Sequence, residues 1–256
     1  MLDYLKFDEN NVKTVCEMGG FHADMNMNIW VRILQPGQKL EFCSDTLETA
    51  VLLLAGRVKF RWGDRVEDCA RENPFDLKPW TLHVSRNSPF AVEAVAESRI
   101  IIQQTDNEKE WEPRFYTPEN CLYQEFGKGQ WGGTGHRVVS TMFDPDNEPD
   151  SNMVLGEVFT KAGKWSSYPP HHHPQPEVYY YEFDKPQGFG ACYNGDDVYK
   201  TADGSACYIE PGKDHQQAAA PGYEMYYVWM IRHIDGDPWY KTTRFVSPEH
   251  EWLVGQ

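Results

Sequence analysis

The chain has 256 residues, of which 40% are hydrophobic and 14% aromatic, enough to bury a core as one large β domain or two smaller ones. Its formal net charge of −15 at pH 7 argues against general binding to nucleic acid or to an anionic membrane, because both would repel such a surface. We therefore expect small molecules or other protein chains as partners, and no nucleic acid or membrane partner. A homo-oligomer of dimer size or larger is a separate expectation.

The compartment is predicted from the apolar runs and the cysteines. No stretch of eighteen apolar residues occurs, and the opening MLDYLKFDEN lacks the order of a secretory signal. The six cysteines form no CxxC pair, which favours reduced thiols over a disulfide framework. These features predict a cytoplasmic protein.

Glycine and proline interrupt short stretches of β-branched and aromatic residues along the whole chain, and this pattern is typical of strands. We predict an all-β fold whose short, evenly spaced strands form sandwiches or barrels. The predicted strands are Ile29 to Leu34, Ala50 to Leu54, Val58 to Trp62, Thr81 to Val84, Ala91 to Val95, Ile100 to Gln104, Val154 to Thr160, Glu177 to Phe183, Ala206 to Glu210 and Met225 to Ile231.

Two segments, which begin at Ile33 and Val158, look like copies of one unit. Gly37 and Gly163 fall in matching turns after a strand, and later Glu48 and Glu177 each precede a dense apolar or aromatic strand. A twofold internal repeat is therefore predicted. We expect an N-terminal half over residues 1–110, a linker and surface loop over 111–150, and a C-terminal half over 151–256.

The candidate chemistry lies in the second copy, within the stretch YPPHHHPQPEV. In an extended chain successive side chains alternate, so His171 and His173 share one face and His172 points away. Glu177 follows at the start of a strand, and His215 comes after the turn PGKD. Three imidazoles and one carboxylate suit a divalent first-row metal, with zinc or manganese foremost and iron or nickel as alternatives.

The competing interpretation is a solvent-exposed loop of histidines and prolines that ends a strand. An isolated HxH would favour that interpretation, because so short a pattern is common by chance. Here the later glutamate, the PGxxH turn and the β context agree, and together they favour a metal site. The first copy has no HxH, so we expect it to be a degenerate half without a metal site.

At these residues the sequence resembles a known family. H-x-H-x₃-E followed by P-G-x-x-H is similar to the two motifs of the cupin superfamily. The segments GKWSSYPPHHH, EVYYYEF, PQGFG, AAAPGYEMYY and SPEHEW, with GHRVV in the middle region, resemble the 5-deoxy-glucuronate isomerases, a two-cupin family related to the 4-deoxy-5-keto-uronate isomerases. The resemblance covers most of the chain and implies two cupin-type β-barrels in tandem (a bicupin).

The resemblance further implies a metal-dependent aldose-ketose isomerase of myo-inositol catabolism. Its substrate would be a deoxyuronate, with 5-deoxy-glucuronate converted to 2-deoxy-5-keto-gluconate. Two positions depart from the family pattern. An acidic residue usually follows the HxH, where this chain has Pro174, and an asparagine usually stands at the position of Trp229.

Strand alternation from Glu177 places Tyr179 and Tyr181 on the same side of the strand as the carboxylate. We therefore expect Glu177, Tyr179 and Tyr181 as catalytic residues, with the tyrosines relaying protons or contacting substrate hydroxyls. A structural role at the rim of a sheet is the alternative for the tyrosines.

Arg137, Lys213, Gln187 and Gln217 are predicted to bind the substrate. Arg137 in GHRVV is the first candidate for the uronate carboxylate, because a guanidinium can bind both oxygens; Lys213 beside the predicted metal turn and Arg232 are the alternatives for this carboxylate. Gln187 and Gln217 could donate hydrogen bonds to sugar hydroxyls.

Two other functions fit the same residues. The ligand set also serves oxygen chemistry, so an iron-dependent cupin dioxygenase is one alternative. A non-catalytic bicupin that binds a sugar acid is the other.

Overall fold

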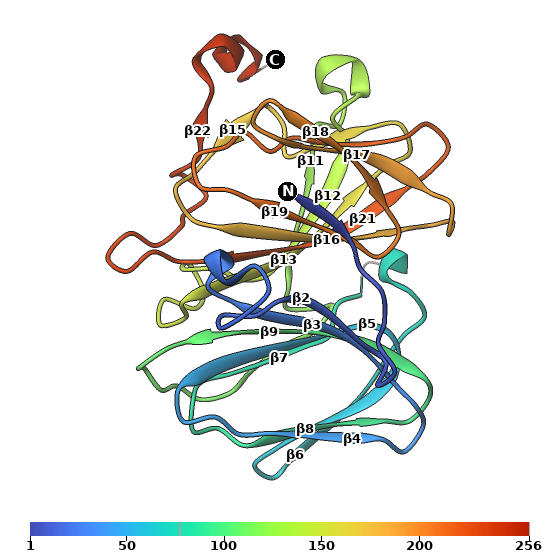
Figure 1. The fold of residues 1–256 in the computed structure, drawn as a ribbon, viewed down its shortest axis with the longest axis vertical. Helices are drawn as coiled ribbons and strands as arrows, with labels where there is room; N and C mark the ends of the chain where they lie inside the picture. Colours follow the sequence, from blue (N-terminus) through green and yellow to red (C-terminus); the bar gives the residue numbers. More distant parts are fainter. Residues whose placement is uncertain (77, 256) are drawn as a thin grey trace. The chain divides into compact units, whose positions relative to one another are not determined.

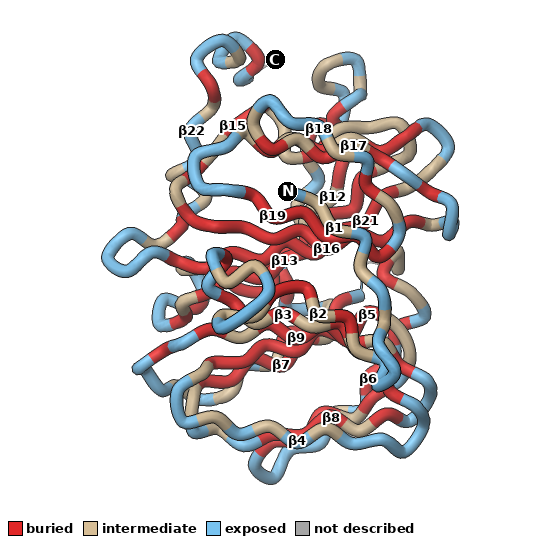
Figure 2. The backbone as a smooth tube through the Cα atoms, viewed as in Figure 1, coloured by how far each residue is buried: buried red, intermediate tan, exposed pale blue. Residues whose placement is uncertain are grey.

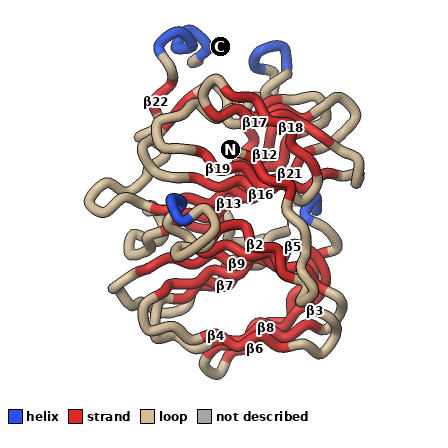
Figure 3. Tube along the Cα trace, viewed as in Figure 1, coloured by secondary structure: helices blue, strands red, loops and turns tan. Residues whose placement is uncertain are grey.

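The computed structural model describes residues 1–76 and 78–255; residues 77 and 256, which fall within the predicted domain ranges, lie outside this part. Strands make up nearly all of its regular structure, as Figures 1 and 3 show, so the all-β prediction is confirmed. In the described part, the helical elements are four short 3-10 turns: η1 (Ala23–Met25), η2 (Pro74–Asp76), η3 (Gln130–Gly133) and η4 (Pro248–Leu253). None of its helices is long and apolar enough to cross a membrane.

The chain divides into two compact units whose bounds differ from the predicted halves. Unit 1 comprises Met1–Leu5, Leu122–Pro145 and Met153–Gln256, and unit 2 comprises Lys6–Cys121 and Asp146–Asn152. Residues 111–150, predicted as linker and surface loop, instead contain the strands β10 (Arg114–Tyr116), β11 (Leu122–Phe126) and β12 (Arg137–Phe143). The region contains the glycine cluster GKGQWGGTG and the acidic loop DPDNEPDSN, and both patterns favour turns. They led to the prediction of a loop, although they only separate short strands.

Unit 1 is built around a seven-stranded antiparallel sheet in the order β1-β19-β16-β21-β13-β12-β11. A four-stranded sheet, β14-β20-β17-β18, and the short pair β15-β22 complete the unit. The strands not yet located are β1 (Leu2–Tyr4), β13 (Met153–Thr160), β14 (Trp165–Ser166), β15 (His171–His172), β16 (Glu177–Phe183), β17 (Phe189–Asn194), β18 (Asp197–Ala202), β19 (Ser205–Ile209), β20 (Gln217–Ala219), β21 (Met225–Arg232) and β22 (Phe245–Val246).

Unit 2 contains one nine-stranded antiparallel sheet with the central path β10-β7-β5-β9-β3-β2, to which β4, β6 and β8 are joined. Its remaining strands are β2 (Val12–Cys16), β3 (Asn28–Leu34), β4 (Lys39–Phe42), β5 (Leu47–Trp62), β6 (Arg65–Arg71), β7 (Thr81–Val84), β8 (Phe90–Ala94) and β9 (Ser98–Asp106).

The strand orders confirm the predicted repeat. The central path β7-β5-β9-β3-β2 of unit 2 has the same pattern as β19-β16-β21-β13-β12 of unit 1. Gly37 and Gly163 both follow the strand at the corresponding place and both have positive φ, 84° and 71°. A positive φ favours glycine, which explains why the two copies share this residue.

Two predicted strands of unit 2, Ala50 to Leu54 and Val58 to Trp62, form the single strand β5. Gly56 makes this continuity possible at φ 102°, and a Cβ there would overlap the carbonyl oxygen of Glu97. The strand changes partners near this glycine, pairing first with β7 and β9 and then with β6 and β8. The glycine read as a break between strands is therefore a bend within one strand.

The core of unit 1 lies between its two larger sheets. Tyr179, Tyr181 and Tyr227 of the seven-stranded sheet share one cluster of buried side chains with Cys192 and Ala219 of the four-stranded sheet. Figure 2 shows the strands β16 and β21 buried along their length. One face of β16 therefore presents its side chains to the interior of the unit, and the candidate site begins at the first residue of this strand.

Candidate metal centre

Three of the four predicted ligands converge in unit 1. Glu177 is the first residue of β16, His173 lies in the proline-rich segment just before it, and His215 lies in the loop between β19 and β20. The prolines at 170, 174 and 176 disfavour helical backbone for the residues that precede them, which keeps this segment extended. Gly212, at φ 76°, donates its backbone N–H to the carbonyl of His173 at 2.9 Å and so joins the two ligand-bearing segments.

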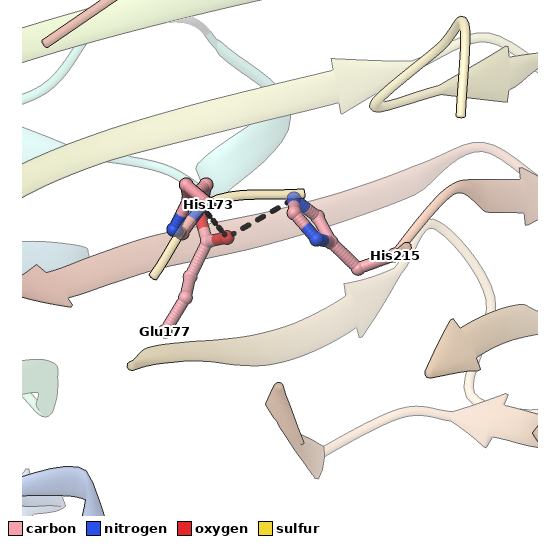
Figure 4. Close-up of side chains that lie close together, drawn as sticks. All are labelled: His173, Glu177 and His215. Carbon is pink, nitrogen blue, oxygen red and sulfur yellow. Dashed lines mark hydrogen bonds and ion pairs between the residues drawn. The ribbon is translucent and has the colours of Figure 1, made fainter. Parts of the chain in front are cut away.

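The carboxylate of Glu177 lies between two imidazoles, as Figure 4 shows. Its Oε2 is 3.2 Å from Nε2 of His173 and 3.4 Å from Nε2 of His215. One ligand atom from each of the three residues lies within 4.8 Å of the others. In residues 1–76 and 78–255 this is the one group of three or more His, Cys, Asp or Glu side chains gathered so closely.

The other ring nitrogens show how the imidazoles are oriented. Nδ1 of His173 lies 3.0 Å from the carbonyl of Gln175, and Nδ1 of His215 lies 2.9 Å from the carbonyl of Lys213. A carbonyl only accepts, so each Nδ1 carries a proton, and in the neutral form of either ring the Nε2 lone pair points at the carboxylate. Two lone pairs and a carboxylate facing one point repel one another unless a cation lies between them. The donor set therefore fits a metal ion.

His171, the fourth predicted ligand, lies beside this group. Its ring centroid is 4.7 Å from that of His215, and its Nδ1 is 2.8 Å from the carbonyl of Pro169. The Nδ1 atom of His171 thus carries a proton as in the other two histidines. Its ligand atoms, however, are not within 4.8 Å of those of all three residues, His173, Glu177 and His215. His172 points elsewhere, with Nδ1 2.9 Å from Oδ1 of Asp214, as strand alternation predicts.

Burial keeps the imidazoles of His171 and His215 neutral. Desolvation is the main cause that lowers the pKa of His171 well below its ordinary value and the pKa of His215 to about 4. Desolvation likewise raises the pKa of the Tyr179 phenol well above its ordinary value. At neutral pH the site therefore offers unprotonated imidazole nitrogens beside a protonated phenol.

A cavity of about 380 Å³ opens onto this group. His171, His173 and Glu177 line it, together with Tyr179 and Arg137. The other lining residues are Gln124, Phe126, Gln130, Trp131, Val139, Thr141, Val158, Ser167, Tyr168, Pro169, Tyr227, Trp229, Trp239, Lys241, Arg244, Val246, Leu253, Val254 and Gly255. A site of this size and mixed lining suits a small polar ligand.

The two predicted catalytic tyrosines have different surroundings. Tyr179 lines the cavity, and its hydroxyl lies 3.3 Å from Oγ of Ser167, which also lines it. Tyr181 is fully buried outside the cavity lining and donates its hydroxyl to Oε1 of Gln217 at 2.7 Å. Gln217, also outside the lining, donates Nε2 to the carbonyl of His215 at 2.6 Å. Tyr181 and Gln217 thus hold the backbone of His215 from positions outside the cavity.

The remaining predicted substrate contacts are dispersed. Gln187 and Lys213 are exposed and do not line the cavity. Arg137 lines it but is held by the protein, because Nη1 donates to the carbonyl of Gly135 at 3.0 Å and Nη2 to the carbonyl of Tyr168 at 2.9 Å. Its burial lowers the pKa of Arg137 to about 10.

Sequence reasoning missed several lining residues. Tyr227 and Trp229 could have been found by alternation along β21, since they pair in register with Tyr181 and Tyr179 of β16 and so lie on the same face of the sheet. Lys241 and Arg244 lie in KTTRF, a stretch between a strand and the SPEHEW motif that has no strand or helix pattern. Only the cavity itself reveals these two cations.

Comparison with curated proteins finds relatives along nearly the whole chain. The chain is 28% identical over 262 residues to the 5-deoxy-glucuronate isomerase of Bacillus licheniformis, covering 95% of this chain and 93% of the relative. It is 30% identical over 265 residues to the 5-deoxy-glucuronate isomerase of Bacillus subtilis strain 168, covering 96% and 94%.

Solved structures share the fold. An IolB-like protein from Salmonella typhimurium LT2 superposes with a TM-score of 0.86 at 20% identity, covering 98% of both chains. An oxalate decarboxylase from Bacillus subtilis superposes with a TM-score of 0.61 at 10% identity, covering 93% of this chain and 76% of the other. The model of the KduI/IolB family matches residues 3–253, and the chain therefore belongs to the KduI/IolB family.

Proposed function

We propose that this protein is an aldose-ketose isomerase that acts on a deoxyuronate, with 5-deoxy-glucuronate as the substrate. In this reaction the aldehyde carbon gains a hydrogen, and the neighbouring carbinol carbon becomes the ketone of 2-deoxy-5-keto-gluconate. Membership in the KduI/IolB family and the names of the Bacillus relatives support the substrate class. The proposal rests on one observation, the convergence of His173, Glu177 and His215 beside a cavity with cationic lining.

His173, Glu177 and His215 would hold a divalent metal ion, with His171 as the fourth ligand. Zinc or manganese fits the mixed nitrogen and oxygen set, and iron or nickel is the alternative. A metal ion there would polarise the carbonyl of the substrate as a Lewis acid. The hydrogen bonds from the Nδ1 atoms to backbone carbonyls would hold the imidazoles in the required tautomer.

Tyr179 and Tyr227 supply protonated hydroxyls to the same cavity. Burial raises the pKa of both phenols, so each remains a hydrogen-bond donor at neutral pH. Tyr227 is itself oriented by Ser166, whose Oγ lies 3.1 Å from its hydroxyl. These phenols would orient the substrate oxygens, and Tyr179, beside Glu177, would hold or release a proton at its hydroxyl during isomerisation.

The test is conversion of 5-deoxy-glucuronate by the purified protein, followed by the appearance of the ketose. We expect turnover by the wild type and its loss in His173→Ala and His215→Ala, each with a reduced content of bound metal. His136→Ala is the matched control, because the half-buried His136 pairs with Glu125 outside the cavity lining. Absence of turnover by metal-replete wild type would remove the proposal.

Metal analysis of the same preparations identifies the ion. Oxygen consumption with an aromatic or diketone substrate would instead favour an iron-dependent dioxygenase, and uronate binding without product would favour a non-catalytic binding protein. Calorimetry and oxygen electrode measurements separate the three outcomes.

The proposal includes a cytoplasmic homo-oligomer. No disulfide joins the six cysteines, all of which lie among the described residues, and this suits a reducing compartment. Cell fractionation tests the location, and light scattering of the full chain tests the assembly.

A further inference from the structure

We propose that Arg244 binds the carboxylate of the sugar acid, and that Arg137 maintains the cavity wall. This inference rests on the proposed function and deepens it, because it assigns the residue that selects an acid over a neutral sugar. It differs from the sequence prediction, which placed the carboxylate at Arg137, Lys213 or Arg232.

Arg244 reaches the cavity, and the two terminal nitrogens of its guanidinium are available to a ligand. It lines the same cavity as His171, His173 and Glu177. Its Nε donates to the carbonyl of Lys241 at 3.1 Å, which orients the side chain. Among the described residues no carboxylate pairs with Arg244 and no acceptor binds Nη1 or Nη2. These two donors form the edge of the guanidinium that matches a planar carboxylate.

The other two cations of the cavity are already engaged. Both Nη atoms of Arg137 donate to backbone carbonyls, and its guanidinium stacks 5.3 Å from the ring centroid of Phe126. Lys241 forms an ion pair with the buried carboxylate of Asp144 at 2.5 Å. A ligand carboxylate would have to displace these interactions at either residue, whereas Arg244 is available.

Partial desolvation also favours an anion at Arg244. Neighbouring atoms remove enough water from the guanidinium to lower the pKa of Arg244, and its interactions with Tyr179 and Glu177 act in the opposite direction. The residue still keeps an exposed surface. A partly desolvated cation without a partner gains more from a bound carboxylate than a fully hydrated one does.

The position explains how the substrate would be oriented. In a uronate the carboxylate and the aldehyde are at opposite ends of the carbon chain. Arg244 lines the same cavity as His173 and Glu177 but comes from a different segment. Binding the acid end at Arg244 would leave the aldehyde end for the proposed metal site, so the two anchors would fix the direction of the sugar.

The test compares Arg244→Gln and Arg244→Lys with Lys200→Gln. Lys200 is an exposed cation of unit 1 outside the cavity lining, so its substitution removes the same charge without touching the site. Binding of D-glucuronate and of D-glucose is measured by calorimetry, and KM and kcat for 5-deoxy-glucuronate are measured separately. Circular dichroism confirms that each variant is folded.

We expect wild type and Lys200→Gln to prefer D-glucuronate over D-glucose. Arg244→Gln should lose that preference and raise KM roughly 10- to 100-fold, the worth of a hydrogen bond to a charged group, with a smaller effect on kcat. Arg244→Lys should recover part of the loss, since it restores charge but not the two-donor edge. If folded Arg244→Gln keeps the full preference for D-glucuronate, the inference is wrong. If wild type binds D-glucuronate through Arg244 but converts no 5-deoxy-glucuronate, the inference stands and the proposed function fails.

Discussion

His172 and Asp214 join the two segments that carry the metal-site histidines: Nδ1 of His172 lies 2.9 Å from Oδ1 of Asp214. Asp214 directly precedes His215, and His172 directly precedes His173. The second carboxylate oxygen of Asp214 accepts a hydrogen bond from the hydroxyl of Ser247, which begins the C-terminal segment around η4. His172, the middle histidine of the triplet, thus has a structural role, because its bond to Asp214 connects the segment of His171 and His173 to that of His215.

We expect His172→Ala to weaken metal binding 10- to 100-fold, roughly the effect of losing a residue that orients a ligand. The change removes the link to Asp214 but leaves His173, Glu177 and His215 in place. Titration of the purified variant with zinc or manganese, against a competing chelator, measures the affinity. His136→Ala is the control and should bind metal as the wild type does. Equal affinity in all three proteins would show that the link to Asp214 is dispensable.

Much of the fold was predictable because the core strands can be recognised from their residue composition and from the turns that flank them. Thr81–Val84 and Glu177–Phe183 were predicted at their observed bounds, since they are bounded by turn residues and consist of strand-forming side chains. The short strands β14, β15 and β22 were missed. Each has two residues, too few for any periodicity to appear.

The candidate site was predictable only where its residues form a local pattern. His171, His173 and Glu177 lie within seven residues, and alternation alone puts them on one face. Arg244 instead reaches the cavity from a stretch with no periodic pattern, so its role depends on tertiary placement. Gln217 shows the opposite error, because it was predicted to contact sugar hydroxyls, whereas its side chain bonds to Tyr181 and to the backbone of His215.

Gly156 and Trp229 form a cross-strand pair between β13 and β21, and we expect Gly156→Ala to disturb the cavity. A Cβ at Gly156 would overlap the indole of Trp229, which lines the cavity. The overlap should cost about 1–3 kcal/mol in the free energy of unfolding, as overpacking does, and should lower kcat/KM. Denaturant unfolding and steady-state kinetics measure the two effects.

Two further variants test this cause. Gly19→Ala adds the same methyl group where no atom lies within 4 Å and should be nearly neutral. Trp229→Phe, made in the Gly156→Ala background, should recover part of the lost stability, because the smaller phenyl ring would not overlap the new Cβ. A double variant no more stable than Gly156→Ala would contradict the overlap.

His233 should make the stability of unit 1 depend on pH. Burial is the main cause that lowers the pKa of His233 to about 4, with the positive charge of Arg232 second. Its Nδ1 accepts the backbone N–H of Trp239 at 3.0 Å, which requires the neutral ring. The unfolded chain therefore binds more protons than the folded one between about pH 4 and 6.5. The contribution of His233 to the free energy of unfolding should therefore be complete above about pH 6.5. It should fall by roughly 3 kcal/mol as the pH decreases through this window.

Urea unfolding of the wild type and His233→Asn across that range checks the contribution. Asparagine keeps an acceptor near the position of Nδ1 but does not titrate, so the variant should show a shallower loss of stability on acidification. An unchanged slope would assign the pH dependence to other groups.

The tyrosines of β16 give a matched pair, because Tyr179 lines the cavity and Tyr181 lies behind it. We expect Tyr179→Phe to lower kcat about 100-fold, within the usual worth of a positioned proton donor, with stability little changed. Tyr181→Phe leaves the Oε1 of buried Gln217 without its donor, so it should cost about 1–3 kcal/mol in the free energy of unfolding and affect kcat only weakly, through the His215 segment. Kinetics and denaturant unfolding of both variants separate the roles. The reverse order of effects on kcat would mean that the reacting atoms approach Tyr181, and the cavity beside Glu177 would not be the place of reaction.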